Sequence, residues 1–175
     1  MLSTRAILSV KYTPASSQAG KAVGGFLRYV QHRDHQEPPE RERGIAGLVR
    51  YVAYRDAASP DGRLFDRGGT AGTAERRQLV RYVRRSLTGV APASAQPGRA
   101  VYRFVLSPED ARGLDLRLAA RRVMEQLERD CGGKLPPWIA AEHRNTAHPH
   151  VHVILAAQRE ETAGRFRELR ISPSG

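Results

Sequence analysis

The sequence predicts an α+β fold in which a central antiparallel sheet is flanked by helices. Segments with the apolar pattern of strands and segments with the apolar period of helices follow one another in the order β-α-α-α-β-α-β-β. Only a short connection separates the last two strands. Because strands and helices do not alternate regularly, this order favours an antiparallel sheet over a doubly wound parallel one.

The first strand and the first two helices are predicted within residues 5–55. Residues 5–12 alternate between apolar and polar, so that one face of a half-buried strand would carry Ala6, Leu8, Val10 and Tyr12. Two helices are expected, at about 20–32 and 45–55, with a proline- and charge-rich loop at 35–44 and a turn at 59–62. Each of these two helices contains a tyrosine.

The third helix is predicted to begin at an N-cap such as Thr73. Its apolar residues recur with helical spacing, and its buried stripe would consist of Leu79, Val83 and Leu87. A linker at 90–98, rich in Ala, Ser, Pro and Gly, and a second strand at 100–106 follow this helix.

The last helix and the last two strands are predicted in the C-terminal part. Ser107 as a cap, Pro108 at the first helical position and the acidic residues after them predict a helix start. The buried stripe of this helix would consist of Leu116, Ala119, Val123 and Leu127, and the helix would end at 131–133. Strands are expected at 138–143 and at about 150–157.

Length and charge restrict the class of protein. The chain has 175 residues, and we expect a single domain over residues 1–175. Its 29 Lys and Arg residues against 18 Asp and Glu residues give a net charge of +11, which favours a polyanionic partner. The single cysteine, Cys131, excludes an intrachain disulfide. No signal peptide or membrane-spanning segment is recognisable, so we expect a cytoplasmic protein.

Four of the six histidines lie within residues 143–152. His150 and His152 share one face of their strand, and a hairpin would bring His143 beside His150. Three neutral imidazoles can hold a divalent cation and leave positions open for a phosphate oxygen. The alternative, histidines on an exposed sheet face, is disfavoured by the apolar run 151–155. His148 is expected to line the site or to contact DNA.

This pattern, His143-x-Asn145-x4-His150-Val151-His152, resembles the third motif of conjugative relaxases, the MOBP-type mobilisation nucleases of the HUH endonuclease superfamily. A leading strand, a helix that contains a tyrosine and a strand that ends in Ser107-Pro108 are also similar. The resemblance implies a five-stranded antiparallel sheet and a bound Mg²⁺ or Mn²⁺. It also implies a tyrosine that attacks a DNA phosphodiester, becomes joined to the 5′ end and releases a 3′-OH. Imidazole ligands would also accept Zn²⁺ or Ni²⁺ in vitro.

Two departures from the family pattern are visible. The acid that usually stands two residues after the first histidine is replaced by Asn145, whose amide cannot transfer a proton at neutral pH. Activity would then be weakened, or an acid would come from elsewhere. The chain also ends soon after the motif, where such domains usually continue, so we expect either a domain truncated at its C-terminus or a short mobile-element protein.

The tyrosine nucleophile has two alternative candidates. Tyr29 lies on the first helix after the leading strand, where the family places its nucleophile, and Tyr51 lies in an almost identical segment. Tyr54 is one turn further along. The other tyrosines are expected in the core, in the case of Tyr12 and Tyr102, or at the DNA groove or in packing, in the case of Tyr82.

The predicted function is site- and strand-specific nicking and rejoining of single-stranded DNA at a transfer origin, in the bacterial cytoplasm, with relaxosome accessory proteins as further partners. Arg77, Arg81 and Arg85, spaced four residues apart on the third helix, are predicted to contact phosphates, the alternative being a merely solvated face. Two other functions stay open: an HUH rolling-circle replication initiator or transposase, and a non-catalytic basic DNA-binding protein.

Overall fold

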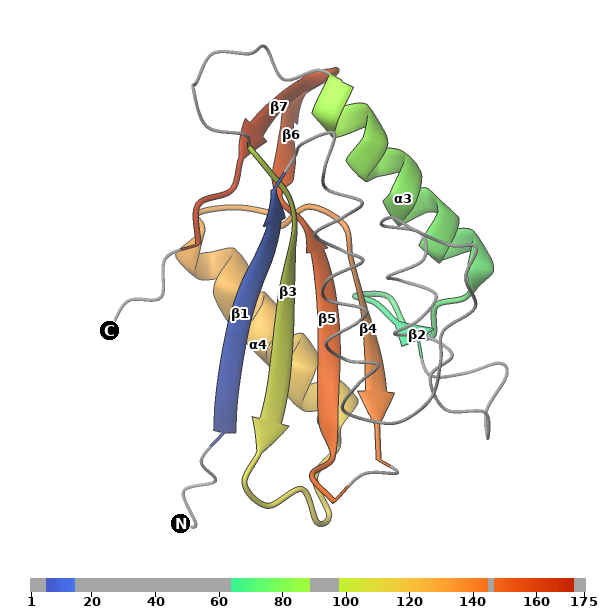
Figure 1. Ribbon diagram of the computed structural model, residues 1–175, viewed down its shortest axis with the longest axis vertical. Helices are drawn as coiled ribbons and strands as arrows, with labels where there is room; N and C mark the ends of the chain where they lie inside the picture. The colour runs from blue at the N-terminus through green and yellow to red at the C-terminus, as the bar shows by residue number, and fades with distance from the viewer. Residues whose placement is uncertain (1–5, 15–63, 89–97, 145–146, 172–175) are drawn as a thin grey trace.

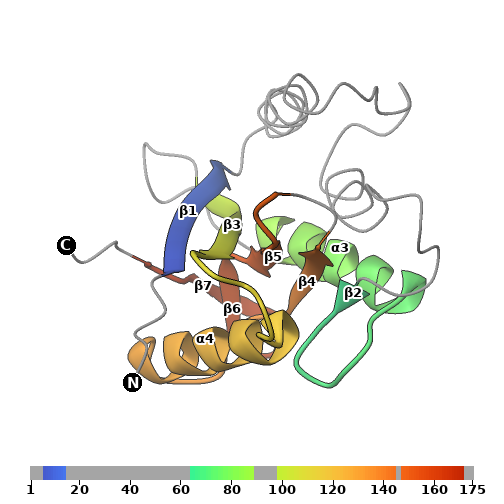
Figure 2. The same cartoon turned by 90° about the horizontal axis from the view of Figure 1, so that it is seen from below.

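In a computed structural model, the described residues of the chain form a five-stranded antiparallel sheet with one helix on each face (Figures 1 and 2). The structure describes residues 6–14, 64–88, 98–144 and 147–171. The strands in spatial order are β1 (Ala6–Pro14), β3 (Arg99–Pro108), β5 (His150–Ala156), β4 (Trp138–His143) and β2 (Leu64–Phe65). The helices are α3 (Thr73–Thr88) and α4 (Leu116–Asp130), and a separate hairpin consists of β6 (Gln158–Thr162) and β7 (Arg165–Glu168). The predicted α+β fold with an antiparallel sheet is confirmed.

The sheet separates two hydrophobic clusters, because successive side chains of a strand point to opposite faces. On β5, Ile154 and Ala156 pack toward α3, whereas Val151, Val153 and Leu155 pack toward α4. Figure 2 shows the two helices on opposite sides of the sheet. A strand that is buried on both faces has a continuous apolar sequence, and this explains the apolar run at 153–157 after His152.

Helix α3 begins at Thr73, so the cap is Gly72, one residue before the predicted N-cap. The Gly72 carbonyl accepts the first helical hydrogen bond, and the Gly72 N–H donates to the Glu75 carboxylate at 2.7 Å. This backbone hydrogen bond lowers the pKa of Glu75. Leu79 and Val83 are buried, and Leu87 packs against the same cluster, so the predicted stripe is confirmed.

The predicted start of the last helix at Ser107 is wrong. Ser107 and Pro108 pair with β1, opposite Ile7 and Ala6, and so extend β3. The helix begins eight residues later, where the Asp115 side chain accepts a hydrogen bond from the Leu118 N–H at 2.9 Å. Pairing with a neighbouring strand has outweighed a local capping signal.

The predicted buried stripe of this helix is partly wrong. Leu116 is buried and Leu127 packs against the core, but the residues between them that point inward are Ala120 and Met124. Val123 is 38% exposed. A shift by one residue keeps the helical spacing, so the sequence pattern alone could not distinguish the two phases.

Strand β1 is less buried than predicted. Leu8 and Tyr12 are 52% and 53% exposed, while Val10 packs against the α4-side cluster and Thr13 is buried. Among the described strands, β1 lies at the edge of the sheet and pairs with β3 alone, which is consistent with the exposure. Tyr12 is therefore not a core residue, whereas the prediction for Tyr102, which is 1% exposed, is confirmed.

The predictions for residues 15–63 lie outside the described residues. These include the helices at 20–32 and 45–55 and the tyrosines Tyr29, Tyr51 and Tyr54. The linker predicted at 90–98 lies almost wholly outside them as well. The hairpin of β6 and β7 was not predicted from the sequence.

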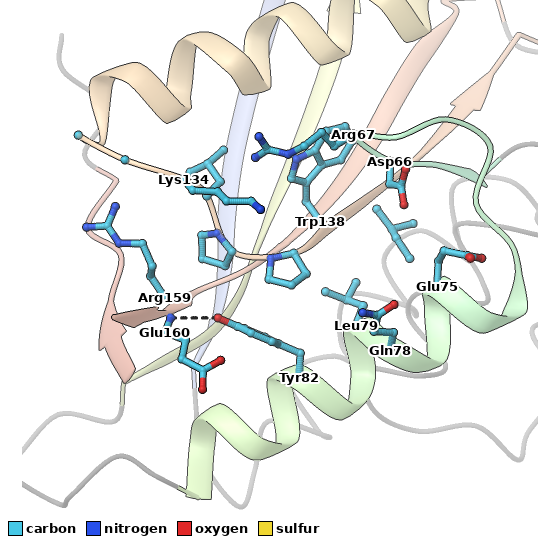
Figure 3. A pocket seen from close by; sticks show the side chains of 16 residues that line it. Asp66, Arg67, Glu75, Gln78, Leu79, Tyr82, Lys134, Trp138, Arg159 and Glu160 are labelled. Carbon is cyan, nitrogen blue, oxygen red and sulfur yellow. Dashed lines mark hydrogen bonds between the residues drawn. The ribbon is translucent and has the colours of Figure 1, made fainter. Parts of the chain in front are cut away.

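Tyr82 joins α3 to the β6–β7 hairpin. Its hydroxyl donates to the Gln158 carbonyl at 3.0 Å and accepts from the Glu160 N–H at 3.1 Å, the bond drawn in Figure 3. Its ring meets Phe166 edge-on, with the centroids 5.7 Å apart. Tyr82 thus has a packing role, and burial raises the pKa of its hydroxyl.

Replacing Tyr82 by Phe should destabilise the fold by about 1–3 kcal/mol, because a partly buried N–H and a carbonyl each lose their partner. Urea unfolding followed by circular dichroism measures the change in the free energy of unfolding. Arg81→Ala, at the exposed neighbouring position, is the control and should change that free energy by less than about 0.5 kcal/mol. Equal stability of Tyr82→Phe and the original protein would contradict the prediction.

Candidate active site

The three candidate metal ligands lie on one face of the sheet. In the β4–β5 pair, His143 is opposite His150 and Ala141 is opposite His152. Side chains that are directly opposite in an antiparallel pair share a face. The predicted hairpin is therefore confirmed, and the histidines lie on the same face as Ile154, the face that α3 covers further along.

The three imidazole rings are in mutual contact. The ring centroids of His143 and His150 are 5.3 Å apart, those of His143 and His152 are 5.1 Å apart, and those of His150 and His152 are 4.8 Å apart. His143 is only 1% exposed, while His150 and His152 are partly exposed. The cluster therefore has a buried side and a side that a ligand can approach.

The orientation of the His150 ring is set by the loop before β5. Its Nδ1 lies 2.8 Å from the carbonyl oxygen of His148. A carbonyl only accepts hydrogen bonds, so Nδ1 carries the proton and the Nε2 of the neutral ring offers its lone pair. A backbone carbonyl in this position is a common way to orient a histidine that binds a metal.

Two of the histidines fit a shared metal ion well. The Nε2 atoms of His150 and His152 are 3.0 Å apart. Two nitrogens bound at about 2.1 Å, at right angles on an octahedral ion, would also lie about 3.0 Å apart. Without a metal, the same distance corresponds to a hydrogen bond from one ring to the other, so metal binding would displace a proton.

The His143 ring lies close to the other two rings, but its lone pair does not point toward the metal position that His150 and His152 could share. Its ring is stacked on that of His150 with an interplanar angle of 5°. The lone pairs of an imidazole lie in the ring plane, so those of two parallel stacked rings do not converge. Within the described ranges, no group of three His, Cys, Asp or Glu side chains is arranged to hold a metal ion. A turn of the His143 ring would be required for it to become the third ligand.

Glu142, the acid nearest to the histidines in sequence, faces the other side of the sheet. It is opposite Val151, which packs toward α4, and its side chain is 14% exposed. Its carboxylate accepts hydrogen bonds from Nε of Arg117 at 2.9 Å and from Nε of Arg144. Glu142 therefore anchors the end of β4 to α4 and does not replace the acid missing at Asn145.

The predicted DNA contacts on α3 have different surroundings. Arg77 and Arg81 are exposed. Arg85 pairs with Glu160 at 2.7 Å, and its guanidinium lies over the rings of Tyr82 and Phe166. The end of α3 that carries Arg85 lies beside the β6–β7 hairpin, far from the histidine end of β4 and β5 (Figure 1). The side chain of His148 is exposed, just before β5.

A groove of about 700 Å³ lies at the opposite end of β4 from His143. It is bounded by α3 and by the segment 132–138, with Trp138 and Tyr82 among its lining residues (Figure 3). Several of its charged groups are engaged within the fold, as in the pairs Arg67–Glu128 and Arg85–Glu160. It lies outside the histidine site and adds nothing to it.

One basic residue on the histidine face was missed by the sequence reasoning. Arg103 on β3 is opposite Ile154, and so its side chain shares the face of His152. Burial lowers its pKa to about 10, which leaves the guanidinium protonated at neutral pH. In the sequence, alternation along the strand 100–106 already places Arg103 on the face opposite to the apolar Tyr102 and Phe104. This alternation could have marked Arg103 as a residue outside that apolar face.

Residues 74–171, more than half of the chain, match the family described as the MobA/VirD2-like nuclease domain of relaxases. The chain belongs to the relaxase family. This match confirms the resemblance inferred from the histidine pattern. As a member of this family, the protein is a DNA-nicking nuclease. Neither the curated proteins nor the solved structures gave a match.

The matched region of this relaxase domain contains the three histidines and lies after both nucleophile candidates, Tyr29 and Tyr51. Nucleases of the family generally use divalent metal ions. In the part of the chain that is described, neither helix has the length and apolar character needed to cross a bilayer.

Proposed function

We propose that this relaxase nicks and rejoins single-stranded DNA at the transfer origin of a plasmid or mobile element, with specificity for site and strand. A tyrosine, Tyr29 or Tyr51, acts as the nucleophile, and His143, His150 and His152 hold a divalent metal ion, Mg²⁺ or Mn²⁺. The observation that carries the proposal is the contact of the three imidazoles on one sheet face, within a matched relaxase nuclease domain.

The residues of the chain prepare the reaction in three ways. The His148 carbonyl holds the His150 ring with its Nε2 lone pair available, next to Nε2 of His152. The buried His143 closes the side of the cluster away from solvent. The Arg117–Glu142–Arg144 network fixes the strand end from the opposite face. When bound, the metal ion would neutralise charge on the scissile phosphate.

The chemical step is a transesterification. The tyrosine oxygen forms a bond to phosphorus as the bond from phosphorus to the 3′ oxygen breaks, and that oxygen leaves as a 3′-OH after taking a proton. The DNA 5′ end stays joined to the tyrosine, so the reverse attack by a 3′-OH rejoins the strand. The free pKa of tyrosine is about 10, so its proton must be removed or its phenolate stabilised. Arg28 and Arg50, each directly before a candidate tyrosine, would favour the phenolate.

Covalent capture tests this proposal. The protein is incubated with labelled single-stranded DNA and Mn²⁺, and denaturing electrophoresis then detects a protein–DNA adduct. We expect an adduct on one tyrosine, identified by peptide mapping. Complete absence of an adduct with every oligonucleotide and metal would favour the non-catalytic DNA-binding alternative. Cleavage confined to replication or transposition origins would favour a rolling-circle initiator or transposase of the HUH class.

The partners and location proposed with this function are single-stranded DNA at a transfer origin, relaxosome accessory proteins and the bacterial cytoplasm. Residues 1–175 would act as a single domain. Zn²⁺ or Ni²⁺ is expected to bind the imidazoles in vitro, because these ions prefer nitrogen ligands more strongly than Mg²⁺ does.

The α3 arginines are proposed to contact phosphates, and so is His148 through its exposed side chain. Replacing Arg77, Arg81 and Arg85 together by Ala should weaken DNA binding and flatten its dependence on salt, because fewer counterions are released. Fluorescence anisotropy at several salt concentrations measures both effects. Because Arg85 is paired with Glu160, most of the change should come from Arg77 and Arg81.

The control for the arginine triple variant is Arg122→Ala, at an exposed position on α4, on the opposite face of the sheet. It removes one exposed charge outside the proposed interface and should leave the salt dependence nearly unchanged. An unchanged salt slope in the triple variant would show that these arginines form a merely solvated face.

A further inference from the structure

The histidine face of the sheet changes character along its length. Toward the start of β4, its residues are apolar and pack under α3: Val101, Ile139, Ile154 and Ala156. Toward the end of β4, the face carries the three histidines. The strands on the other side of β5 carry basic residues on the same face, because Arg103 on β3 and Lys11 on β1 have the same orientation as His152 and lie level with Ile154.

The strand register places these two cations one inward-facing pair away from His152, toward the start of β4. Arg103 is opposite Ile154, two residues after His152 on β5, and Lys11 is opposite Arg103. Adjacent strands are about 4.8 Å apart and alternate residues about 6.8 Å apart, so the Cα atoms of Arg103 and His152 are separated by about 8 Å. Lys11 lies one strand further out, at the sheet edge. His152, Arg103 and Lys11 therefore lead obliquely from the histidine cluster to the edge of the sheet, while Val105 and Ser9 occupy the row directly beside His152.

We propose that Arg103 and Lys11 are positioning residues that bind the DNA phosphates beside the scissile one, so that the substrate strand crosses the sheet from β5 toward β1. This inference rests on the proposed function of the histidine site. Arg103 would grip a phosphate with the planar fork of its guanidinium, and the exposed Lys11 would act as a point charge at the edge where the strand leaves the sheet. Contacts of this kind set the register of a nucleic acid without reading its bases.

Two features of Arg103 support a role in binding an anion. Its side chain is only partly exposed, and a charge removed from water interacts more strongly with an anion than an exposed charge does. Both Arg103 and Lys11 also interact with other groups of the folded chain. A phosphate contact would therefore be added to interactions that these side chains already make.

The experiment measures binding of fluorescently labelled oligothymidylate, a probe with phosphates but no specific site, by the double variant Lys11→Ala/Arg103→Met. The methionine keeps a long apolar stem for packing and removes the charge. We expect affinity to fall about 10- to 100-fold. The slope of the logarithm of the binding constant against the logarithm of salt concentration should fall by about 1.4, because each phosphate that the protein no longer neutralises lowers it by about 0.7.

Matched measurements separate this inference from its alternatives. Arg122→Ala/Arg129→Ala removes two exposed charges on α4, on the opposite face of the sheet, and should leave the salt slope nearly unchanged. Arg103→Lys keeps the charge but loses the planar fork, so it should keep the salt slope of the original protein while binding more weakly than the original. Titration with Mn²⁺ should give the same metal affinity in the original protein and the double variant. Circular dichroism establishes that the variants are folded.

The experiments distinguish failure of the proposed phosphate contacts of Lys11 and Arg103 from failure of the proposed nuclease function. If the original protein binds oligothymidylate but never forms a covalent adduct, the nuclease function fails, while the phosphate contacts can still be measured. If the adduct forms and a folded Lys11→Ala/Arg103→Met protein keeps the affinity and salt slope of the original, the proposed role of these two residues is overturned. With the adduct intact, we expect the double variant to need more DNA for half-maximal nicking, while its rate at saturating DNA changes less than about threefold.

Discussion

Replacing the nucleophilic tyrosine by phenylalanine should abolish the covalent protein–DNA adduct altogether. Only the phenolic oxygen can form the bond to phosphorus, and phenylalanine removes that single atom. We expect this result for either Tyr29→Phe or Tyr51→Phe. DNA binding should be preserved, because the histidines and the basic residues remain. Denaturing electrophoresis measures the adduct, and anisotropy measures the binding.

The other tyrosines provide the controls. The hydroxyl of Tyr82 is engaged with the backbone of Gln158 and Glu160. The hydroxyl of Tyr102 donates to the Leu169 carbonyl at 2.6 Å, beneath the opposite face of the sheet. Tyr12 is opposite Tyr102 and so also faces away from the histidines. Tyr102→Phe and Tyr12→Phe should therefore form the adduct, provided that they fold.

Phenylalanine at the wrong candidate position should leave most of the activity. If Tyr29→Phe and Tyr51→Phe each retain the adduct, Tyr54 becomes the next position to replace. Retention of the adduct by a triple variant of Tyr29, Tyr51 and Tyr54 would exclude this group of nucleophiles.

The hairpin that carries the site could be predicted because two independent patterns agree there. The strand 138–143 is bounded by prolines on one side, and His150 to Leu155 forms an apolar run interrupted only by histidine at alternate positions. A single register brings His143 opposite His150, and the structure has this register. α3 was also predictable, since a helical stripe and a start signal coincide at Thr73.

Elements at the edges of the fold were harder to predict, because their structure depends on distant partners. Ser107 and Pro108 have the local signature of a helix start, yet β1 pairs with them. The β6–β7 hairpin is largely polar and turns at Gly164, whose φ of 76° suits glycine. Its stability comes from contacts such as those of Tyr82 and Arg85 with residues more than seventy positions away in sequence.

In the candidate site, the sequence predicted which histidines lie together but not how their rings are oriented. Alternation on β5 and a short connection were sufficient to group the histidines. The stacking of His143 on His150 and the His148 carbonyl behind His150 depend on loop geometry, which no periodic pattern encodes. Arg103 was missed because its position relative to the histidines follows from the order of strands in the sheet.

Replacing His150 or His152 by Ala should abolish metal binding at the cluster and reduce nicking by about 100-fold or more, because the metal contributes several kcal/mol of charge stabilisation at the phosphate. Thermal unfolding provides a measurement independent of activity. At a Mn²⁺ concentration about 100 times the dissociation constant, bound metal should stabilise the original protein by about 2.7 kcal/mol. Neither variant should gain this stabilisation, and a chelator should remove it from the original protein.

His148→Ala is the matched control for the metal ligands. His148 orients His150 through its backbone carbonyl, which the substitution retains, and its side chain is exposed. The variant should therefore keep metal-dependent stabilisation, and any loss should be confined to DNA binding. His143→Ala tests the third ligand, because its ring must turn away from the His150 stack before it can coordinate. If Mn²⁺ stabilises His150→Ala and His152→Ala as much as it stabilises the original protein, the metal is bound elsewhere and the histidine cluster is not the metal centre.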